Sequence, residues 1–249
     1  MKVLFVGDVH NHFYMFKNIK EFDDKYNFDR IIFLGDYVDD WFTTNNESLE
    51  TLDYIIELKK KDPNKYTFCL GNHELSYLGY PCAGHKKPME EIMYRTLRDN
   101  INCFDLYTSV ILNNEEYICS HAGITNSYIG IIKQIKPGIK WKEALEIMNN
   151  DKLAYLSLLK YVSSLRGGLY EFSSMVWCDK REHEYFNSRE RYIIPNQIIG
   201  HTPVHTICNI KDDDVCLYFI DTHSTFSDGR NYGDCSYLLW NEDKFEIIK

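Results

Sequence analysis

The sequence predicts an α/β fold in which helices cover a layered sheet. Short apolar runs rich in Val, Ile and Phe recur along the 249 residues, and each run ends in a polar cluster. Segments with helical spacing separate the first three runs, and strands that alternate with helices pair in parallel. No internal repeat and no linker rich in Pro, Gly or Ser interrupts the pattern, so we expect one domain over residues 1–249.

Six apolar runs are the predicted strands. Each is short, contains β-branched or aromatic residues, and stops at glycine or at polar residues. In chain order they are KVLFVG from Lys2, RIIFLG from Arg30, YTFCLG from Tyr66, EYICSHAG from Glu116, NQIIGHT from Asn196 and CLYFIDTH from Cys216.

The clearest helix lies between the second and third runs, in NNESLETLDYIIELKKK. We expect Asn45 or Asn46 to cap its first turn, because an asparagine side chain accepts a hydrogen bond from a free backbone N–H. Its predicted buried face consists of Leu49, Leu52, Ile55 and Ile56.

The longest helical region is predicted from Trp141 to Leu165, where apolar residues recur at roughly helical intervals. RGGLY at Arg166 ends it, because two glycines do not continue a helix. We therefore expect a helical excursion around residues 125–175, which either covers a functional site or serves only for packing.

The composition limits the possible partners. With 44% hydrophobic residues the chain can build one large core, and its formal net charge is −9. Sequence-independent nucleic-acid binding and binding to anionic membranes both need a basic surface, so we expect neither partner.

The location is expected to be cytoplasmic. The first apolar run ends after four residues, at Gly7 and Asp8, which is too short for a secretory signal. No uninterrupted apolar stretch is long enough to cross a bilayer. The eight cysteines never form C-x-x-C, and Cys69 and Cys119 lie inside apolar runs, so we expect reduced core residues.

The polar clusters at the strand ends are the candidate functional residues. In FLGDYVDDWF three carboxylates follow an apolar run, and buried acids need a positive partner. Ligands of open α/β sheets gather where strands end, so these clusters should converge. They are Asp8 and His10 in GDVH, Asp36, Asp39 and Asp40 in GDYVDD, Asn72, His73 and Glu74 in GNHE, His121 in SHAG, and His201 in GHTP.

These side chains offer carboxylate, imidazole and amide ligands without a thiolate. That mixture suits divalent ions such as Mn²⁺, Fe or Zn²⁺, and one shared carboxylate lets two ions lie together. Two-metal sites serve phosphoryl and phosphodiester hydrolysis. A glycine before each ligand segment is expected to let the backbone turn tightly.

The ordered set GD-x-H, GD-x-x-D and GNHE, followed by single histidines in SHAG and GHT, resembles the calcineurin-like metallophosphoesterases. Within them it looks most like the serine/threonine phosphoprotein phosphatases, including bacterial and phage members such as lambda phosphatase. The resemblance spans Gly7 to His201. It implies a layered β-sandwich flanked by helices, in αββα order, with the metal site at the C-terminal ends of the strands.

The resemblance also implies roles for the motif residues. His73 would be the general acid that protonates the leaving oxygen, and Asp39 would orient and charge it. A hydroxide that bridges two divalent ions, with Mn²⁺ the first candidate, would attack phosphorus in line. The implied ligands are Asp8 and His10 for the first ion, Asp36 for both, and Asn72, His121 and His201 for the second.

The chain departs from the family pattern at three positions. Asp40 and Leu70 stand where arginines would clamp phosphate oxygens, and Asn11 replaces a glycine, which asparagine can do because it tolerates positive φ. Asp40 either faces the substrate, where it would repel a dianionic monoester, or is a solvated loop acid. In MVWCDKREHE, Arg181 becomes the candidate anion contact, with Arg189 and Arg191 as rivals.

Five histidines remain outside the motifs. We expect His12, His85, His183 and His205 to be solvated loop residues, because a lone loop histidine usually is. His223 follows a core-like strand, so approach to the site and simple burial stay equally open.

Three functions compete. The leading one is a metal-dependent phosphomonoesterase acting on phosphorylated protein or a small phosphate ester. A phosphodiesterase or nucleoside polyphosphate hydrolase is the closest rival, since a less charged ester would depend less on the missing arginines. A non-catalytic binding module ranks last, because all six ligand positions, His73 and Asp39 are present.

Overall fold

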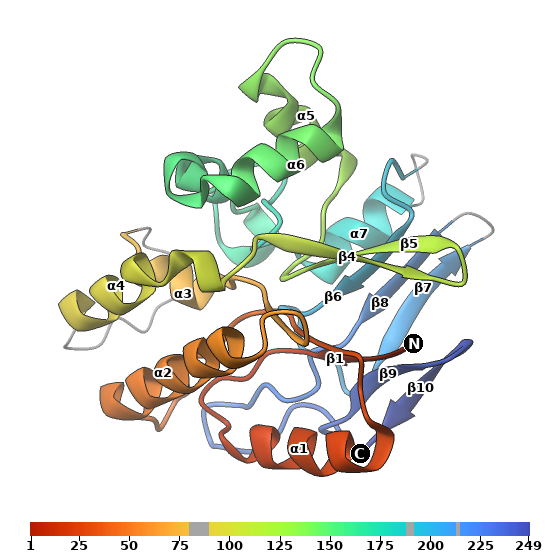
Figure 1. Ribbon diagram of the computed structural model, residues 1–249. Helices are drawn as coiled ribbons and strands as arrows, with labels where there is room; N and C mark the ends of the chain where they lie inside the picture. Colours follow the sequence, from red (N-terminus) through yellow and green to blue (C-terminus); the bar gives the residue numbers. More distant parts are fainter. Residues whose placement is uncertain (80–89, 188–191, 213–214) are drawn as a thin grey trace.

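Two sheets packed face to face form the centre of the molecule, and helices cover their outer sides (Figure 1). The structure is a computed structural model and describes residues 1–79, 90–187, 192–212 and 215–249. One five-stranded sheet has the order β10 (Lys244–Ile248), β9 (Tyr237–Asn241), β1 (Lys2–Val6), β2 (Arg30–Phe33) and β3 (Tyr66–Phe68). The other has the order β4 (Tyr107–Leu112), β5 (Glu115–Ser120), β6 (Asn196–Ile199), β8 (Val215–Phe219) and β7 (Cys208–Asp212). The predicted layered α/β fold is confirmed.

Alternation along the strands explains the layers. Val3 and Phe5 of β1 face the core between the sheets, whereas Leu4 and Val6 face the helices. Both faces of β1 are buried, so the strand reads as one continuous apolar run. The helices of the structure are α1 (Tyr14–Tyr26), α2 (Asn45–Lys61), α3 (Asn72–Tyr77), α4 (Glu90–Asp99), α5 (Asn126–Ile132), α6 (Trp141–Asn150) and α7 (Lys180–Asn187).

The strand pairing is mixed rather than parallel throughout. β1, β2 and β3 pair in parallel, as do β5, β6 and β8, but β4, β7, β9 and β10 are antiparallel strands that the sequence did not predict. β7 and β10 have few apolar residues and β4 is partly exposed, whereas β9 contains a continuous buried apolar run at Tyr237–Trp240. The β4–β5 hairpin turns at Asn113 and Asn114, whose φ values of 47° and 65° suit a tight hairpin turn.

Two helix predictions need correction. The cap of α2 is Thr44, whose hydroxyl accepts from the Glu47 N–H while the Glu47 carboxylate accepts from the Thr44 N–H at 2.6 Å. This reciprocal pair satisfies two N–H groups, which a lone asparagine cap does not. The predicted face is otherwise as expected: Leu52, Ile55 and Ile56 are buried, and Leu49 is partly buried.

The region from 141 to 165 is not one helix. α6 ends at Asn150, and 3₁₀ turns follow at Lys152–Leu159 and Ser164–Arg166. The Asn149 side chain accepts from the Leu106 N–H at 2.6 Å, and Asp151 has φ −130° and ψ 62°. Short polar side chains of this kind compete with helical hydrogen bonding. The segment lies with α5 at the top of Figure 1.

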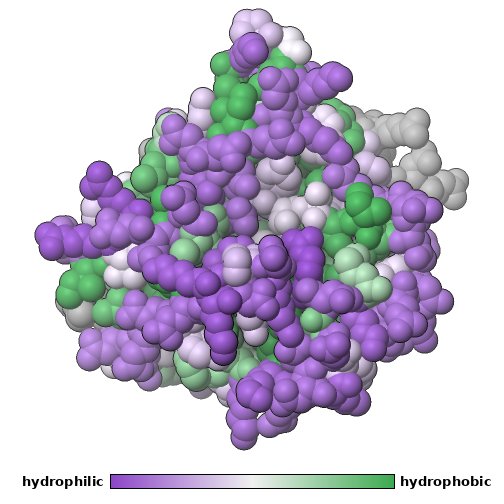
Figure 2. Space-filling view, in the orientation of Figure 1, coloured by the Kyte–Doolittle hydropathy of each residue, from purple (hydrophilic) through white to green (hydrophobic). Residues whose placement is uncertain are grey.

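The surface and the cysteines fit a protein with a large apolar interior. The face in Figure 2 is mostly hydrophilic, and its apolar areas are small and separate. All seven cysteines in the described ranges are free thiols. None of the described helices has the length and apolar character needed to span a membrane.

Candidate metal centre

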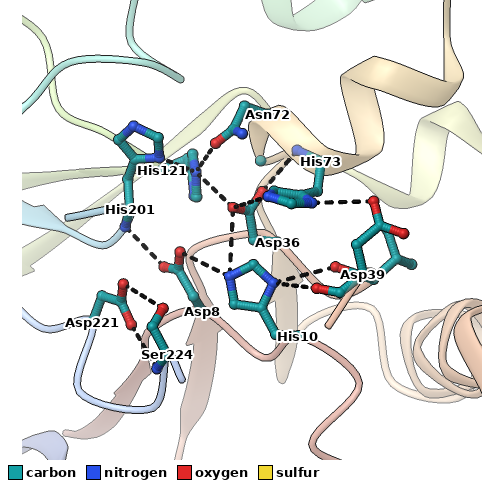
Figure 3. Close-up of polar contacts among 12 residues, drawn as sticks. Asp8, His10, Asp36, Asp39, Asn72, His73, His121, His201, Asp221 and Ser224 are labelled. Carbon is teal, nitrogen blue, oxygen red and sulfur yellow. Dashed lines mark hydrogen bonds and ion pairs between the residues drawn. The ribbon is translucent and has the colours of Figure 1, made fainter. Parts of the chain in front are cut away.

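The ends of β1, β2, β3 and β6 bring the predicted ligands to one cavity of about 440 Å³ (Figure 3). His121, at the end of β5, is fully buried beside it. The residues of the set that line the cavity are Asp8, His10, Asp36, Asp39, Asn72, His73 and His201.

The first ligand group surrounds His10. Its Nδ1 lies 2.7 Å from the Asp39 carbonyl oxygen, and because a carbonyl only accepts, Nδ1 carries the proton. The Nε2 lone pair therefore points elsewhere, 3.8 Å from an Asp8 oxygen and 3.9 Å from an Asp36 oxygen. Such a backbone partner fixes the tautomer of a metal-binding histidine. The opening between these three atoms suits a cation.

The second ligand group surrounds His121. Its Nδ1 donates to the Leu34 carbonyl at 2.8 Å, so Nε2 is the ring nitrogen that a bound cation would take. That Nε2 lies 2.9 Å from Asn72 Oδ1, 3.0 Å from His201 Nδ1 and 3.4 Å from Asp36 Oδ2. Acceptor atoms converge here, and His201 Nε2 is buried without a hydrogen-bond partner in the described part of the chain. A divalent cation with N/O preference fits this donor set.

Asp36 belongs to both groups. Its Oδ2 faces His10 and His121, and its Oδ1 accepts from the His73 N–H at 2.9 Å. Burial opposes ionisation, but the nearby His121 and His73 imidazoles hold the pKa of Asp36 well below its usual range. Two trios of side chains that include Asp36 each bring their possible ligand atoms within 4.8 Å of one another: His10 with Asp36 and His73, and Asp36 with His121 and His201.

His73 is paired as a proton donor. Its Nδ1 lies 3.1 Å from Asp39 Oδ2, and the other Asp39 oxygen accepts from the Tyr77 hydroxyl at 2.6 Å. Burial lowers the pKa of His73, but Asp36 and the hydrogen bond to Asp39 outweigh it and raise the pKa to about 9. Cations bound nearby would lower this pKa again. Without bound cations, the arrangement keeps the His73 imidazole protonated at neutral pH.

The site concentrates backbone strain. His10, Asp36, Asp39 and His201 have φ values of 43°, 51°, 63° and 62°, in the left-handed region that non-glycine residues rarely adopt. Asn11, at φ 59°, adopts the positive φ expected for it. Strain of about 1–3 kcal/mol at each such residue persists only where the surroundings hold it, and functional sites are where it collects.

The glycines act differently from the expectation. Of the four glycines that precede ligand segments, Gly7, Gly35, Gly71 and Gly200, only Gly35 has a positive φ, at 111°. Gly71 and Gly200 are needed for close approach instead, because a Cβ at Gly71 would lie 2.0 Å from Asp36 Oδ1 and one at Gly200 would lie 2.6 Å from Asp8 Oδ1. The missing side chains leave room for the two carboxylates.

Glu74, for which the sequence suggests no role, holds the strained loop. Its fully buried carboxylate accepts from the N–H groups of Asp36, Tyr37, Val38 and Gly71 at 2.7–3.3 Å. Burial, reinforced by the Asp36 charge, raises the pKa of Glu74 to about 7. Each carboxylate oxygen accepts two N–H hydrogen bonds, so Glu74 fixes the backbone of the loop that carries Asp36.

Glu74→Gln should lower the free energy of unfolding by about 2–4 kcal/mol, because its NH₂ group would face two N–H donors in a buried site. Chemical denaturation of the metal-free protein measures the change. Glu57→Gln, an exposed acid on α2, is the control and should stay within about 0.5 kcal/mol. Equal stability of Glu74→Gln and wild type would contradict the supporting role.

Asp221 is a second acid that sequence reasoning missed. Its buried carboxylate accepts from the Ser224 N–H at 3.2 Å and the Ser224 hydroxyl at 2.8 Å, and it lies beside Asp8 in Figure 3. Burial and the charge of Asp221 raise the pKa of Asp8 well above its usual range. In the sequence, the IDTHS segment offers both Asp221 and His223, and no motif indicates which of the two lies near the ligands.

The cavity contains an arginine other than the expected one. Arg166 lines it, with Nε 2.9 Å from Asp179 Oδ2 and an Nη2 donating to Thr202 Oγ1 at 2.9 Å. Arg181 lies outside this cavity, where it pairs with Asp179 and is largely exposed. The rivals Arg189 and Arg191 fall outside the described residues. In the sequence, Arg166 indicates only the end of a helix.

Asp40 is not a solvated loop acid. Its side chain is 13% exposed and lines the cavity, and it contacts His12 Nε2 at 3.3 Å and Thr225 Oγ1 at 2.9 Å. Burial raises its pKa, but hydrogen bonds from His12, the Trp41 N–H and Thr225 outweigh this and lower the pKa to about 2. The cavity wall therefore carries a fixed negative charge.

The remaining histidines differ from expectation. The prediction of solvation is wrong for His183, which is buried between Tyr192 Oη and the Ala122 carbonyl, and for His12, which binds Asp40. His205 is exposed as predicted, and His85 lies outside the described residues. His223 is buried against the Tyr237 ring and does not line the cavity.

Comparisons with known proteins agree with this geometry. Over 188 residues the chain is 26% identical to the serine/threonine-protein phosphatase 6 catalytic subunit of Drosophila melanogaster, covering 74% of this chain and 52% of that protein. The chain thus spans about half the length of this curated relative. A cold-active protein-tyrosine phosphatase of a psychrophilic Shewanella species has a similar fold, with TM-score 0.59 at 14% identity over all of this chain and 80% of that one.

A mutant cold-active protein tyrosine phosphatase is similar in the same way, with TM-score 0.56, 14% identity and the same coverage. Residues 1–226 match the calcineurin-like phosphoesterase family, whose members depend on two metal ions. The chain therefore belongs to the calcineurin-like phosphoesterase family.

Proposed function

We propose that the chain is a metal-dependent phosphomonoesterase, acting on a phosphorylated protein or a small phosphate ester. One observation carries the proposal: a single cavity combines two cation-binding groups that share Asp36, a proton donor at His73, and the guanidinium of Arg166. A terminal phosphate needs all three kinds of group, because its negative charge, its leaving oxygen and its free oxygens each require a partner.

The residues divide the reaction between them. Asp8, His10 and Asp36 would hold one divalent ion, and Asp36, Asn72, His121 and His201 the other, with Mn²⁺ the first candidate. Bound there, the ions supply activation of water as a nucleophile and neutralisation of charge on the phosphoryl oxygens. His73, with Nδ1 held by Asp39, donates the proton on its other nitrogen to the leaving oxygen.

In this proposal Arg166 binds the phosphate oxygens, the role that the family pattern gives to arginines at positions 40 and 70. Leu70 is fully buried and Asp40 is an anion, so neither can bind phosphate. Asp179 and Thr202 hold the Arg166 side chain from one side, and its Nη1 makes no hydrogen bond to any described residue. A guanidinium fixed in this way can bind phosphoryl oxygens with little loss of side-chain freedom.

Arg166→Ala should raise KM for a phosphomonoester about 10- to 100-fold, the size expected for loss of a charge-assisted hydrogen bond of about 1.5–3 kcal/mol. Steady-state kinetics with Mn²⁺ measure it. Arg181→Ala is the matched control, since Arg181 binds the same Asp179 but lies outside the cavity. If both variants lost affinity equally, the effect would come from Asp179 and not from phosphate binding.

Asp40 favours one alternative, a phosphodiesterase. A dianionic monoester is repelled by an anionic cavity wall more strongly than a monoanionic diester is. The deciding experiment is a turnover panel with Mn²⁺ on p-nitrophenyl phosphate, bis-p-nitrophenyl phosphate, a phosphopeptide and a dinucleoside polyphosphate. Higher kcat/KM on the two monoesters supports the proposal. Preference for the diester would replace it with the alternative, and preference for the polyphosphate would contradict both.

A further inference from the structure

The ring of Trp41 forms an aromatic wall of the metal cavity. Trp41 lines the cavity and leaves 49% of its surface exposed, and Trp177 and Pro203 line it too. The volume of about 440 Å³ lies within the range of roughly 300–1,000 Å³ typical of small-molecule sites. A phosphoryl group fills only part of such a space, so this wall faces another portion of the substrate.

Trp41 lines the same cavity as His73. It follows Asp39 by two residues, and Asp39 binds the imidazole of His73 that faces the leaving oxygen in the proposed reaction. The group attached to that oxygen shares this cavity with the ring of Trp41.

The indole of Trp41 is held in place by contacts across the fold. Its Nε1 donates to the Thr225 carbonyl at 3.1 Å, and its backbone N–H donates to Asp40 Oδ1 at 2.7 Å. The same Asp40 oxygen accepts from Thr225 Oγ1 at 2.9 Å, and its other oxygen lies 3.3 Å from His12 Nε2. Asp40 thus ties the loop after β2 to the segment after β8. A ring fixed beforehand loses little entropy when it binds.

The negative charge of Asp40 limits which leaving groups can lie against Trp41. Asp40 is anionic and lies beside Trp41, so further phosphates on the leaving group would meet repulsion there. An uncharged aromatic ring is not repelled by Asp40. Its face can stack on the indole of Trp41, and its electropositive edge tolerates a carboxylate.

We propose that Trp41 stacks on an aromatic ring in the leaving group of the phosphate ester, and that Asp40 is the residue that positions Trp41. This inference rests on the proposed monoesterase function. Asp40 stands where the family pattern has an arginine. In this inference it does not bind phosphate; it holds Trp41, which contacts the leaving group.

The test compares benzyl phosphate with ethyl phosphate, which both release a primary alcohol and so need similar protonation. Trp41→Ala should lower kcat/KM on benzyl phosphate about three- to tenfold, through KM, and leave ethyl phosphate nearly unchanged. Trp41→Phe should restore most of the preference. Phe42→Ala is the matched control, because Phe42 is the next residue, is 67% exposed and does not line the cavity.

The role of Asp40 is tested through the ratio of kcat/KM on benzyl phosphate to kcat/KM on ethyl phosphate. Asp40→Ala removes the acceptor for Trp41 and Thr225 and should reduce the benzyl preference. Asp40→Asn keeps an acceptor oxygen and should retain it, even though loss of the charge raises affinity for both esters. Equal losses on both esters in the Trp41 or Asp40 variants would overturn the inference, as would an equal loss on cyclohexylmethyl phosphate, which would make the wall merely apolar.

Binding of benzylphosphonate and ethylphosphonate, measured by calorimetry with Mn²⁺, separates the two proposals. A benzyl preference that disappears in Trp41→Ala supports the aromatic wall even if no ester is hydrolysed, in which case the proposed function fails. Hydrolysis of monoesters without any benzyl preference overturns the wall and leaves the proposed function in place.

Discussion

Asp36→Asn should lower metal content and turnover together. Its Oδ2 faces both ligand groups, so the substitution removes the one charge that both ions would share. We expect metal content after dialysis to fall from up to two ions per chain to below one. The loss of affinity should exceed the roughly 10- to 100-fold change seen when only a hydrogen-bond partner of a ligand is removed.

Elemental analysis and kcat/KM on p-nitrophenyl phosphate, made on the same preparations, check this result. Asparagine keeps an Oδ1 acceptor for the His73 N–H, so the loop should stay in place and circular dichroism should be unchanged. A protein that remains fully active after prolonged chelation, or an Asp36→Asn variant with normal metal content, would contradict the shared-ligand arrangement.

His73→Ala should reduce turnover of an alkyl phosphate by about 10²- to 10⁴-fold while metal content stays near normal. The imidazole is paired with Asp39 and holds a proton at neutral pH, and a poor leaving group depends on that proton. An activated aryl phosphate needs less protonation, so its rate should fall less. Parallel assays on ethyl phosphate and p-nitrophenyl phosphate measure the difference, and equal losses would count against the acid role.

The pH dependence gives a second measure of the same residue. Asp39 raises the pKa of His73, so Asp39→Asn should lower that pKa. The protonated acid is then lost at lower pH, and the basic limb of the kcat profile should move down. In His73→Ala this limb should disappear, because no imidazole remains to titrate there.

The parallel strands and most of the candidate ligands could be predicted from the sequence, because each depends on residues that are close together in the chain. A buried parallel strand is a short apolar run, and the ligand follows it within a few residues, as Asp8 follows β1 and Asp36 follows β2. The antiparallel strands were missed, since β4 and β10 are partly exposed and their apolar residues do not form a continuous run. The long helical region was misjudged because Asn149 bonds to Leu106, which periodicity does not reveal.

The chain by itself determined where the buried parallel strands end and which acids and histidines follow them, because both features depend on neighbours in sequence. The order of the layers came from the resemblance to the family. Only the tertiary structure decided which arginine enters the cavity and what Asp40 does. Arg166 reaches the cavity from a 3₁₀ turn and is aimed by Asp179 and Thr202, while Asp40 is bonded to Thr225, 185 residues away. Contacts of that separation form only when the sheets pack, so no local pattern can encode them.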